Sequence, residues 1–215
     1  MALADNVIHA WHFDESSGDA ADAVGSMTLT NVNTSTYGAG LLANAVTTVR
    51  ASSQRLTSTA GVFPSTPSAY TINVWFQVSA TPSSGQSYKI FKNDGNALNA
   101  HIEAFYFNNS GTTELYCRMS DNTNTTFTIL TNQSLSLNTW YMLTLKWNGT
   151  TFQAYLNASS LGTQSVGSIG YKDNISELFS IAGFSPDGNE YRSGKTDETV
   201  RSASIFRTRF WYDLL

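Results

Sequence analysis

The strongest constraint on the fold is a pair of hydrophobic runs on either side of Asn148-Gly149. Trp140 to Trp147 and Phe152 to Leu156 are both rich in aromatic, aliphatic and β-branched residues, which favour β-strands. Asn and Gly tolerate the positive φ angles that a tight hairpin turn requires. The segment is therefore predicted to form two antiparallel strands joined by a turn.

Strand patterns recur along most of the chain, and no long segment shows helical periodicity. The clearest alternation runs from Tyr70 to Val78, where every second residue is apolar and Trp75 lies on the opposite face. Two segments rich in glycine are predicted to lack strands: a turn at Tyr37 to Leu42 and a Gly/Ser-rich stretch at Ser159 to Gly170. About a dozen strand candidates remain, which predicts an all-β, two-sheet antiparallel β-sandwich.

The composition suits a single domain spanning residues 1–215. The chain is 41% hydrophobic, which is enough for a sizeable core, but only 13% charged. The net charge of −4 and the lack of basic runs argue against nucleic-acid binding. No segment is long and apolar enough for membrane insertion, and the N-terminus shows no secretory signal. Cys117, the single cysteine, is expected to be buried and inert.

Four stretches, in order, carry a resemblance to a known family. They are Ala10 to Gly18 (AWHFDESSG), Tyr70 to Phe76 (YTINVWF), Trp140 to Asn157, and Thr196 to Val200 (TDETV). Together they resemble the laminin-G-like jelly-roll modules of the concanavalin A-like lectin/glucanase superfamily. The chain departs from that pattern at Ala158, where glycine is usual, and in the C-terminal segment 201–215.

The resemblance implies a calcium ion (Ca²⁺) where the opening loop meets the closing strand. Asp22 and Asp197 are the positions to which this role carries over, with loop carbonyls completing the oxygen ligands that Ca²⁺ requires. The alternative is that Asp14, Asp19 and Asp22 cap turns through side-chain hydrogen bonds.

The carboxylates do not form the pattern of a glycoside hydrolase. Glucan-cleaving members of the superfamily carry acidic residues at alternate positions of one strand, so that they point into one cleft. Glu103 stands alone, and the adjacent Asp197 and Glu198 face opposite ways on a strand. We therefore expect no enzymatic activity, and glycoside hydrolysis is a less favoured alternative.

A candidate ligand-binding patch lies on the predicted hairpin Ala100 to Ser120. Alternation places four side chains on its outward face: His101, Glu103, Tyr116 and Arg118. An aromatic ring beside charged groups is suited to sugars, because sugar CH groups stack on the ring and hydroxyls bond to the charges. The alternative is an ordinary polar sheet face with a cross-strand Glu–Arg pair.

These patterns favour a non-catalytic, lectin-like recognition module for glycans or protein partners. The alternative is a structural protein of a virus or phage particle, such as a decoration or fibre-head subunit, which would form a homo-oligomer or a larger particle. The localisation stays open, with a virion or an extracellular surface suggested.

Overall fold

The protein is described here by a computed structural model, covering residues 6–58, 68–93, 102–121, 123, 125–167, 179–183 and 191–202. Nearly all regular structure in these residues is β-strand, apart from a short 3₁₀-helix at Arg50–Ser52. The described part contains no helix long and apolar enough to cross a membrane. The strands are β1 (Val7–Trp11), β2 (Thr30–Val32), β3 (Thr36–Ala39), β4 (Asn44–Thr48), β5 (Arg55–Ser58), β6 (Tyr70–Val78), β7 (Ser87–Asn93), β8 (Ile102–Asn109), β9 (Thr112–Ser120), β10 (Thr126–Asn132), β11 (Tyr141–Trp147), β12 (Thr151–Leu156), β13 (Ser159–Ser165), β14 (Phe179–Ile181) and β15 (Gly194–Ser202).

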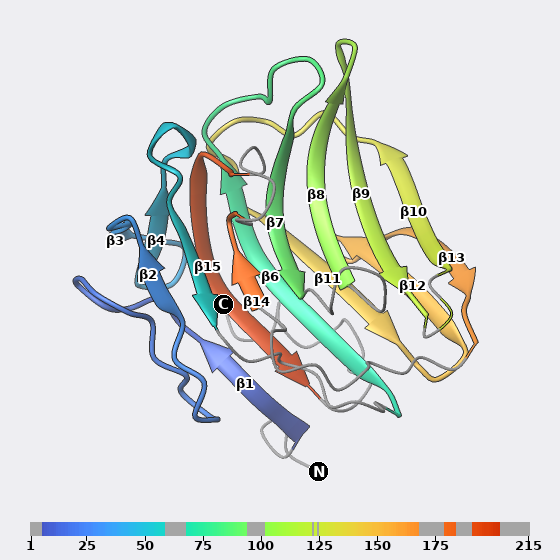
Figure 1. Ribbon diagram of the computed structural model, residues 1–215, viewed down its shortest axis with the longest axis horizontal. Coiled ribbons are helices and arrows are strands. Elements are labelled where there is room, and N and C mark those ends of the chain that lie inside the picture. The colour runs from blue at the N-terminus through green and yellow to red at the C-terminus, as the bar shows by residue number, and fades with distance from the viewer. Residues whose placement is uncertain are drawn as a thin grey trace.

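The strands form two antiparallel sheets that stack face to face (Figure 1). The eight-stranded sheet has the order β13-β12-β11-β6-β15-β4-β3, and β1 also pairs with β15. The seven-stranded sheet has the order β10-β9-β8-β7-β14-β5-β2. The predicted two-sheet antiparallel sandwich is therefore confirmed.

The core fills the space between the sheets, as the alternation in β6 predicts. Tyr70, Ile72, Val74, Phe76 and Val78 are all buried on the inner face of that strand. The seven-stranded sheet contributes a matching inner row on β9, Leu115, Cys117 and Met119. Burial raises the pKa of the Cys117 thiol, which agrees with an inert core cysteine.

The hairpin predicted around Asn148-Gly149 joins β11 to β12. Trp147 pairs with Phe152, and Gly149 has a φ of +97°. The Asn148 side-chain oxygen accepts the N–H groups of Thr150 and Thr151 at 3.0 and 2.8 Å. The hairpin is confirmed, with a turn longer than a two-residue loop.

Two segments predicted to lack strands contain them. Within the predicted turn Tyr37 to Leu42, residues up to Ala39 belong to strand β3, which pairs with β4. The predicted Gly/Ser-rich stretch Ser159 to Gly170 begins with strand β13, which pairs with β12. In both cases, pairing with a neighbouring strand outweighs the weak strand propensity of glycine and serine.

The two sheets meet along one side, where β10 lies against β13 (Figure 1). The Gln164 side-chain amide donates to the Thr128 carbonyl at 3.2 Å. Gly162 has a φ of +150°, and a Cβ atom there would lie 3.1 Å from Ile129 Cγ2. Glycine therefore allows the two edge strands to approach closely.

Candidate ligand-binding surface

The hairpin of β8 and β9 brings three of the four predicted ligand-binding residues onto one face. Glu103 lies opposite Arg118, and Phe105 lies opposite Tyr116, on the outer face of the seven-stranded sheet. The neighbouring side chains in each strand point into the core, as the alternation predicts. His101 lies outside the described residues.

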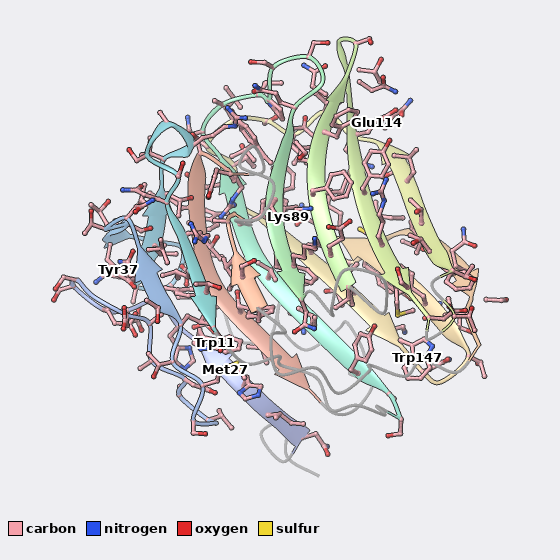
Figure 2. The ribbon with its side chains drawn as sticks, in the orientation of Figure 1. Trp11, Met27, Tyr37, Lys89, Glu114 and Trp147 are labelled. Carbon is pink, nitrogen blue, oxygen red and sulfur yellow. The ribbon has the colours of Figure 1, made fainter. Side chains whose placement is uncertain are left out.

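Glu103 forms ion pairs with two cations. Its Oε2 atom lies 2.6 Å from Lys89 Nζ, and its Oε1 atom lies 3.6 Å from Arg118 Nη1. Lys89 and Glu103 are both buried, whereas the Arg118 side chain is 35% exposed. The predicted cross-strand Glu–Arg pair is present, but the closer partner is Lys89. Figure 2 labels Lys89 on β7.

Strand β7, which carries Lys89, does not alternate regularly along its whole length. A β-bulge between Lys89 and Phe91 shifts the register, so that Lys89 lies opposite Phe105 while Phe91 lies opposite Ala104. Lys89 lies before the bulge and shares the outer face with Phe105. The consecutive apolar residues Ile90 and Phe91 both join the core.

Two aromatic rings complete the group. The rings of Phe105 and Tyr116 stack with centroids 4.7 Å apart and planes inclined by 8°. Lys89 Nζ lies 4.5 Å from the Phe105 centroid, and Arg118 Cζ lies 4.8 and 4.9 Å from the two centroids. We call Lys89, Glu103, Phe105, Tyr116 and Arg118 the aromatic–ionic cluster.

The outer part of the aromatic–ionic cluster is accessible. Tyr116 is half-buried, and Leu130 lies opposite it on β10 with 45% of its surface exposed. The Tyr116 hydroxyl donates to Glu114 Oε2 at 2.9 Å, and burial together with Glu114 raises the pKa of this phenol. The surface thus offers an aromatic ring, an aliphatic neighbour and the donors of Arg118 side by side.

Asp22, predicted as a metal ligand, organises the opening loop. One carboxylate oxygen accepts the backbone N–H groups of Ala10, Val24 and Gly25. The other accepts the N–H of Met27 and lies 2.5 Å from His9 Nδ1. Burial alone would raise the pKa of Asp22, but these hydrogen bonds lower it. A cation would have to displace donors from this carboxylate, so Asp22 fits a capping role better than a metal-binding one.

Asp197, the second predicted metal ligand, has a different environment. It is buried in β15, and its Oδ2 atom accepts the N–H groups of Leu41 and Leu42 at 2.6 and 3.2 Å. Burial raises the pKa of Asp197, and the negative charge of Asp14 contributes to the rise. Burial likewise raises the pKa of the adjacent Glu198, although His12 Nδ1 lies 2.6 Å from its Oε1 atom. No three His, Cys, Asp or Glu side chains group into a metal site within the described part of the chain.

Residues 50–201 match the family model of the concanavalin A-like lectin/glucanases superfamily. The chain belongs to this superfamily. The match includes β5 to β14 and most of β15, and it therefore includes the whole aromatic–ionic cluster. No curated protein matches this superfamily member in sequence.

Solved structures with the same fold are only distantly similar in sequence. The binding domain of Paraclostridial Mosquitocidal Protein 1 has a TM-score of 0.74 at 16% identity, covering 96% of this chain and 51% of that one. The binding domain of Botulinum Neurotoxin DC in complex with SialylT has a TM-score of 0.70 at 13% identity, covering 96% and 50%. This superfamily member thus spans about half the length of those chains.

A third structure is similar over nearly its full length. Domain 4 of AbnA, a GH43 extracellular arabinanase from Geobacillus stearothermophilus, in complex with arabinotriose, has a TM-score of 0.68 at 14% identity. The alignment covers 92% of each chain. At such low identities, these likenesses establish the shared fold of the superfamily and no more.

Proposed function

We propose that this chain is a non-catalytic recognition module that binds glycans through the outer face of the seven-stranded sheet. The observation that carries the proposal is the half-buried Tyr116, whose ring stacks on Phe105 and contacts Arg118 beside the exposed Leu130. An aromatic and aliphatic surface can take the CH groups of a sugar, while the guanidinium donates to its hydroxyls. The ion pair of Lys89 with Glu103 holds this surface in place.

The similar solved structures support this proposal. Domain 4 of AbnA is in complex with arabinotriose, and the Botulinum Neurotoxin DC binding domain is in complex with SialylT. Another structure has that binding domain in complex with rat synaptotagmin II, which is a protein. Protein binding is therefore the alternative kind of recognition for this chain.

The spacing of carboxylates supports the non-catalytic part of the proposal. Glu114 lies opposite Phe107, four residues along β8 from Glu103. At about 3.3 Å per residue, the two positions are roughly 13 Å apart along the strand. Glycosidase carboxyl groups lie about 5 to 9.5 Å apart and face the substrate. Here each carboxylate binds a neighbouring side chain instead, Glu103 the Lys89 ammonium and Glu114 the Tyr116 hydroxyl.

The test is a glycan array on the parent chain, followed by affinity measurements on two variants. Tyr116→Ala removes the ring from the proposed surface and is expected to weaken glycan binding at least tenfold. Tyr155→Ala is the matched control, because Tyr155 also pairs with a cation, Lys146 Nζ at 5.3 Å, but lies in the other sheet. Equal losses in both variants would contradict the proposed surface.

A glycan array without any binding would contradict glycan recognition by the aromatic–ionic cluster. In that case the predicted role in a virus or phage particle becomes the leading alternative. Size-exclusion chromatography with light scattering tests it, because a particle subunit is expected to form a stable trimer or larger assembly. A monomer that binds a glycan supports the recognition module.

Calcium stabilisation stays part of the proposal. Its support is Asp197, whose charge is destabilised by burial and by Asp14, since a bound cation would relieve both effects. Asp22 fits less well, because N–H donors already surround its oxygens. Calorimetric titration of EDTA-treated protein with calcium tests whether the ion binds. If calcium releases no heat and does not raise Tm, the proposed calcium site is refuted.

A further inference from the structure

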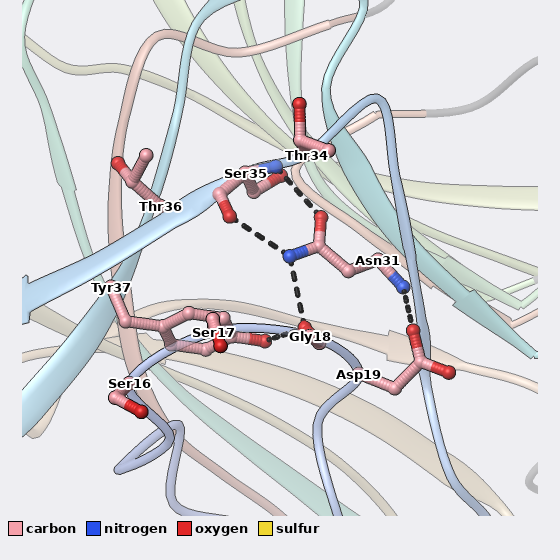
Figure 3. Close-up of a pocket in the computed structure, with 9 residues that line it drawn as sticks. All are labelled: Ser16, Ser17, Gly18, Asp19, Asn31, Thr34, Ser35, Thr36 and Tyr37. Atoms are coloured by element: carbon pink, nitrogen blue, oxygen red, sulfur yellow. Dashed lines mark hydrogen bonds between the residues drawn. The ribbon is translucent and has the colours of Figure 1, made fainter.

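A polar pocket lies away from the aromatic–ionic cluster, beside β2 and β3, the last strands in the order of each sheet. Figure 3 shows the residues that line it. It has a volume of about 420 Å³ and is lined by residues 16–19, Asn31 and residues 34–37. All of these residues precede residue 50, where the match to the superfamily model begins. The pocket is therefore built by a part of the chain that the family match does not include.

Hydrogen bonds hold the walls of the pocket together. The Asn31 side-chain amide donates to the carbonyls of Gly18 and Ser35, both at 2.9 Å, and its oxygen accepts the Ser35 N–H at 2.7 Å. The Asn31 N–H donates to Asp19 Oδ1 at 2.8 Å. The Tyr37 hydroxyl donates to the Gly18 carbonyl at 2.9 Å. Three separate segments are thus fixed relative to one another before any ligand binds (Figure 3).

The side chains on these walls that do not take part in those hydrogen bonds carry hydroxyl groups. Ser16, Ser17, Thr34 and Thr36 are exposed, and a hydroxyl both donates and accepts hydrogen bonds. The Ser35 hydroxyl is buried and has no hydrogen-bond partner among the described residues. The half-buried ring of Tyr37 adds an apolar surface to this polar lining.

The charge of the pocket is negative. Asp19 lies on its wall. Burial and the negative charges of Glu15 and Asp19 raise the pKa of the Tyr37 hydroxyl. Among the residues that the structure describes, no lysine or arginine lines the pocket. An acidic ligand would therefore be repelled, whereas an uncharged polyhydroxylated one meets hydroxyls and a ring.

We propose that this pocket is a second binding site, specific for an uncharged sugar residue. Sugar hydroxyls bond to the side chains of Ser17 and Thr36, and the sugar CH groups contact the ring of Tyr37. The site is separate from the surface in the proposed function, and either one can exist without the other. Two sites on one chain give a multivalent glycan higher avidity than either site alone.

The test uses NMR of the ¹⁵N-labelled chain with methyl glycosides of glucose, galactose, mannose and arabinose as probes. N-acetylneuraminic acid is the acidic comparison. At least one neutral probe is expected to shift the amide signals of residues 16–19 and 34–37, and the acidic sugar is expected to leave them unchanged. Shifts confined to β8, β9 and β10, no shifts at all, or equal shifts with N-acetylneuraminic acid would overturn the proposal.

A double variant, Ser17→Ala with Thr36→Val, removes two hydroxyls without touching the hydrogen bonds that hold the walls. It is expected to weaken binding of the neutral probe at least tenfold. Thr47→Val is the matched control, because Thr47 pairs with Thr36 across β3 and β4 but does not line the pocket. Unchanged binding in the double variant would also overturn the proposal.

One further variant separates the two sites. Tyr116→Ala is expected to weaken binding at the sheet surface at least tenfold and to leave the amide shifts around the pocket intact. Loss of the pocket shifts in Tyr116→Ala, with the fold preserved, would show that the pocket is not an independent site.

Discussion

Replacing Ala158 with glycine is expected to stabilise the protein. Asn157 and Ala158 form the two-residue turn between β12 and β13, and both have positive φ angles, +48° and +67°. A two-residue hairpin turn with positive φ at both positions favours Asn-Gly, because glycine has no Cβ atom to clash in this conformation. Alanine at the second position is therefore strained.

The turn has little freedom to relax this strain. The Asn157 side chain accepts the Met142 N–H at 2.8 Å, and the Asn157 N–H donates to the Met142 carbonyl at 2.9 Å. A left-handed conformation costs a residue with a Cβ atom about 1–2 kcal/mol. Glycine recovers this amount but loses about 0.5–1 kcal/mol through the extra freedom of the unfolded chain. The net gain expected for Ala158→Gly is about 0.5–1 kcal/mol.

Urea unfolding and thermal melts measure this gain. For a chain of this size, 1 kcal/mol corresponds to roughly 2–4 °C in Tm. The matched control is Ala154→Gly in the same hairpin, because Ala154 is buried in the extended strand β12 and has no positive φ. The control is expected to lose stability. An Ala158→Gly variant that is no more stable than the parent would refute the assignment of strain to this turn.

Three further changes test the charged groups. Lys89→Met leaves the Glu103 carboxylate buried without its closer partner, so the free energy of unfolding in urea is expected to fall by about 3–5 kcal/mol. Adding Glu103→Leu should restore most of this loss. Hydrogen bonds lower the folded-state pKa of Asp22, so its contribution to stability is complete above its ordinary pKa of 3.8 and is lost as the pH falls through the folded-state pKa. The difference in unfolding free energy between the parent and Asp22→Ala should shrink in that acidic range. Asp197→Asn keeps an oxygen that can accept the Leu41 N–H but removes a buried charge, so the variant should melt no lower than the parent in EDTA and should lose any rise in Tm that calcium gives the parent.

The sequence predicts the regular strands well because their side chains alternate strictly. Strand β6 has the predicted bounds, and Glu103, Tyr116 and Arg118 share a face because the hairpin loop sets the register of β8 and β9. Alternation alone gives no single pattern for β7, because a one-residue bulge after Lys89 places the adjacent residues Ile90 and Phe91 both in the core.

Strand β13 and the polar pocket escape prediction for other reasons. Asn-Gly at positions 157–158 would have predicted a hairpin turn, but this chain has alanine at position 158. The strand after it has few large apolar residues. The pocket depends on Asn31 bringing residues 16–19 close to residues 34–37. Contacts between polar loops leave no periodic signal in the sequence, so only the folded chain shows them.

The close approach of Gly162 to Ile129 bears on how such chains could polymerise. Strand edges normally invite another chain to add on, which is how fibrils grow. Where β10 abuts β13, each edge is shielded by the other, and the Thr128 carbonyl already has a donor from Gln164. Strand addition is therefore disfavoured along this rim of the sandwich, although both of its strands are the last in their sheets.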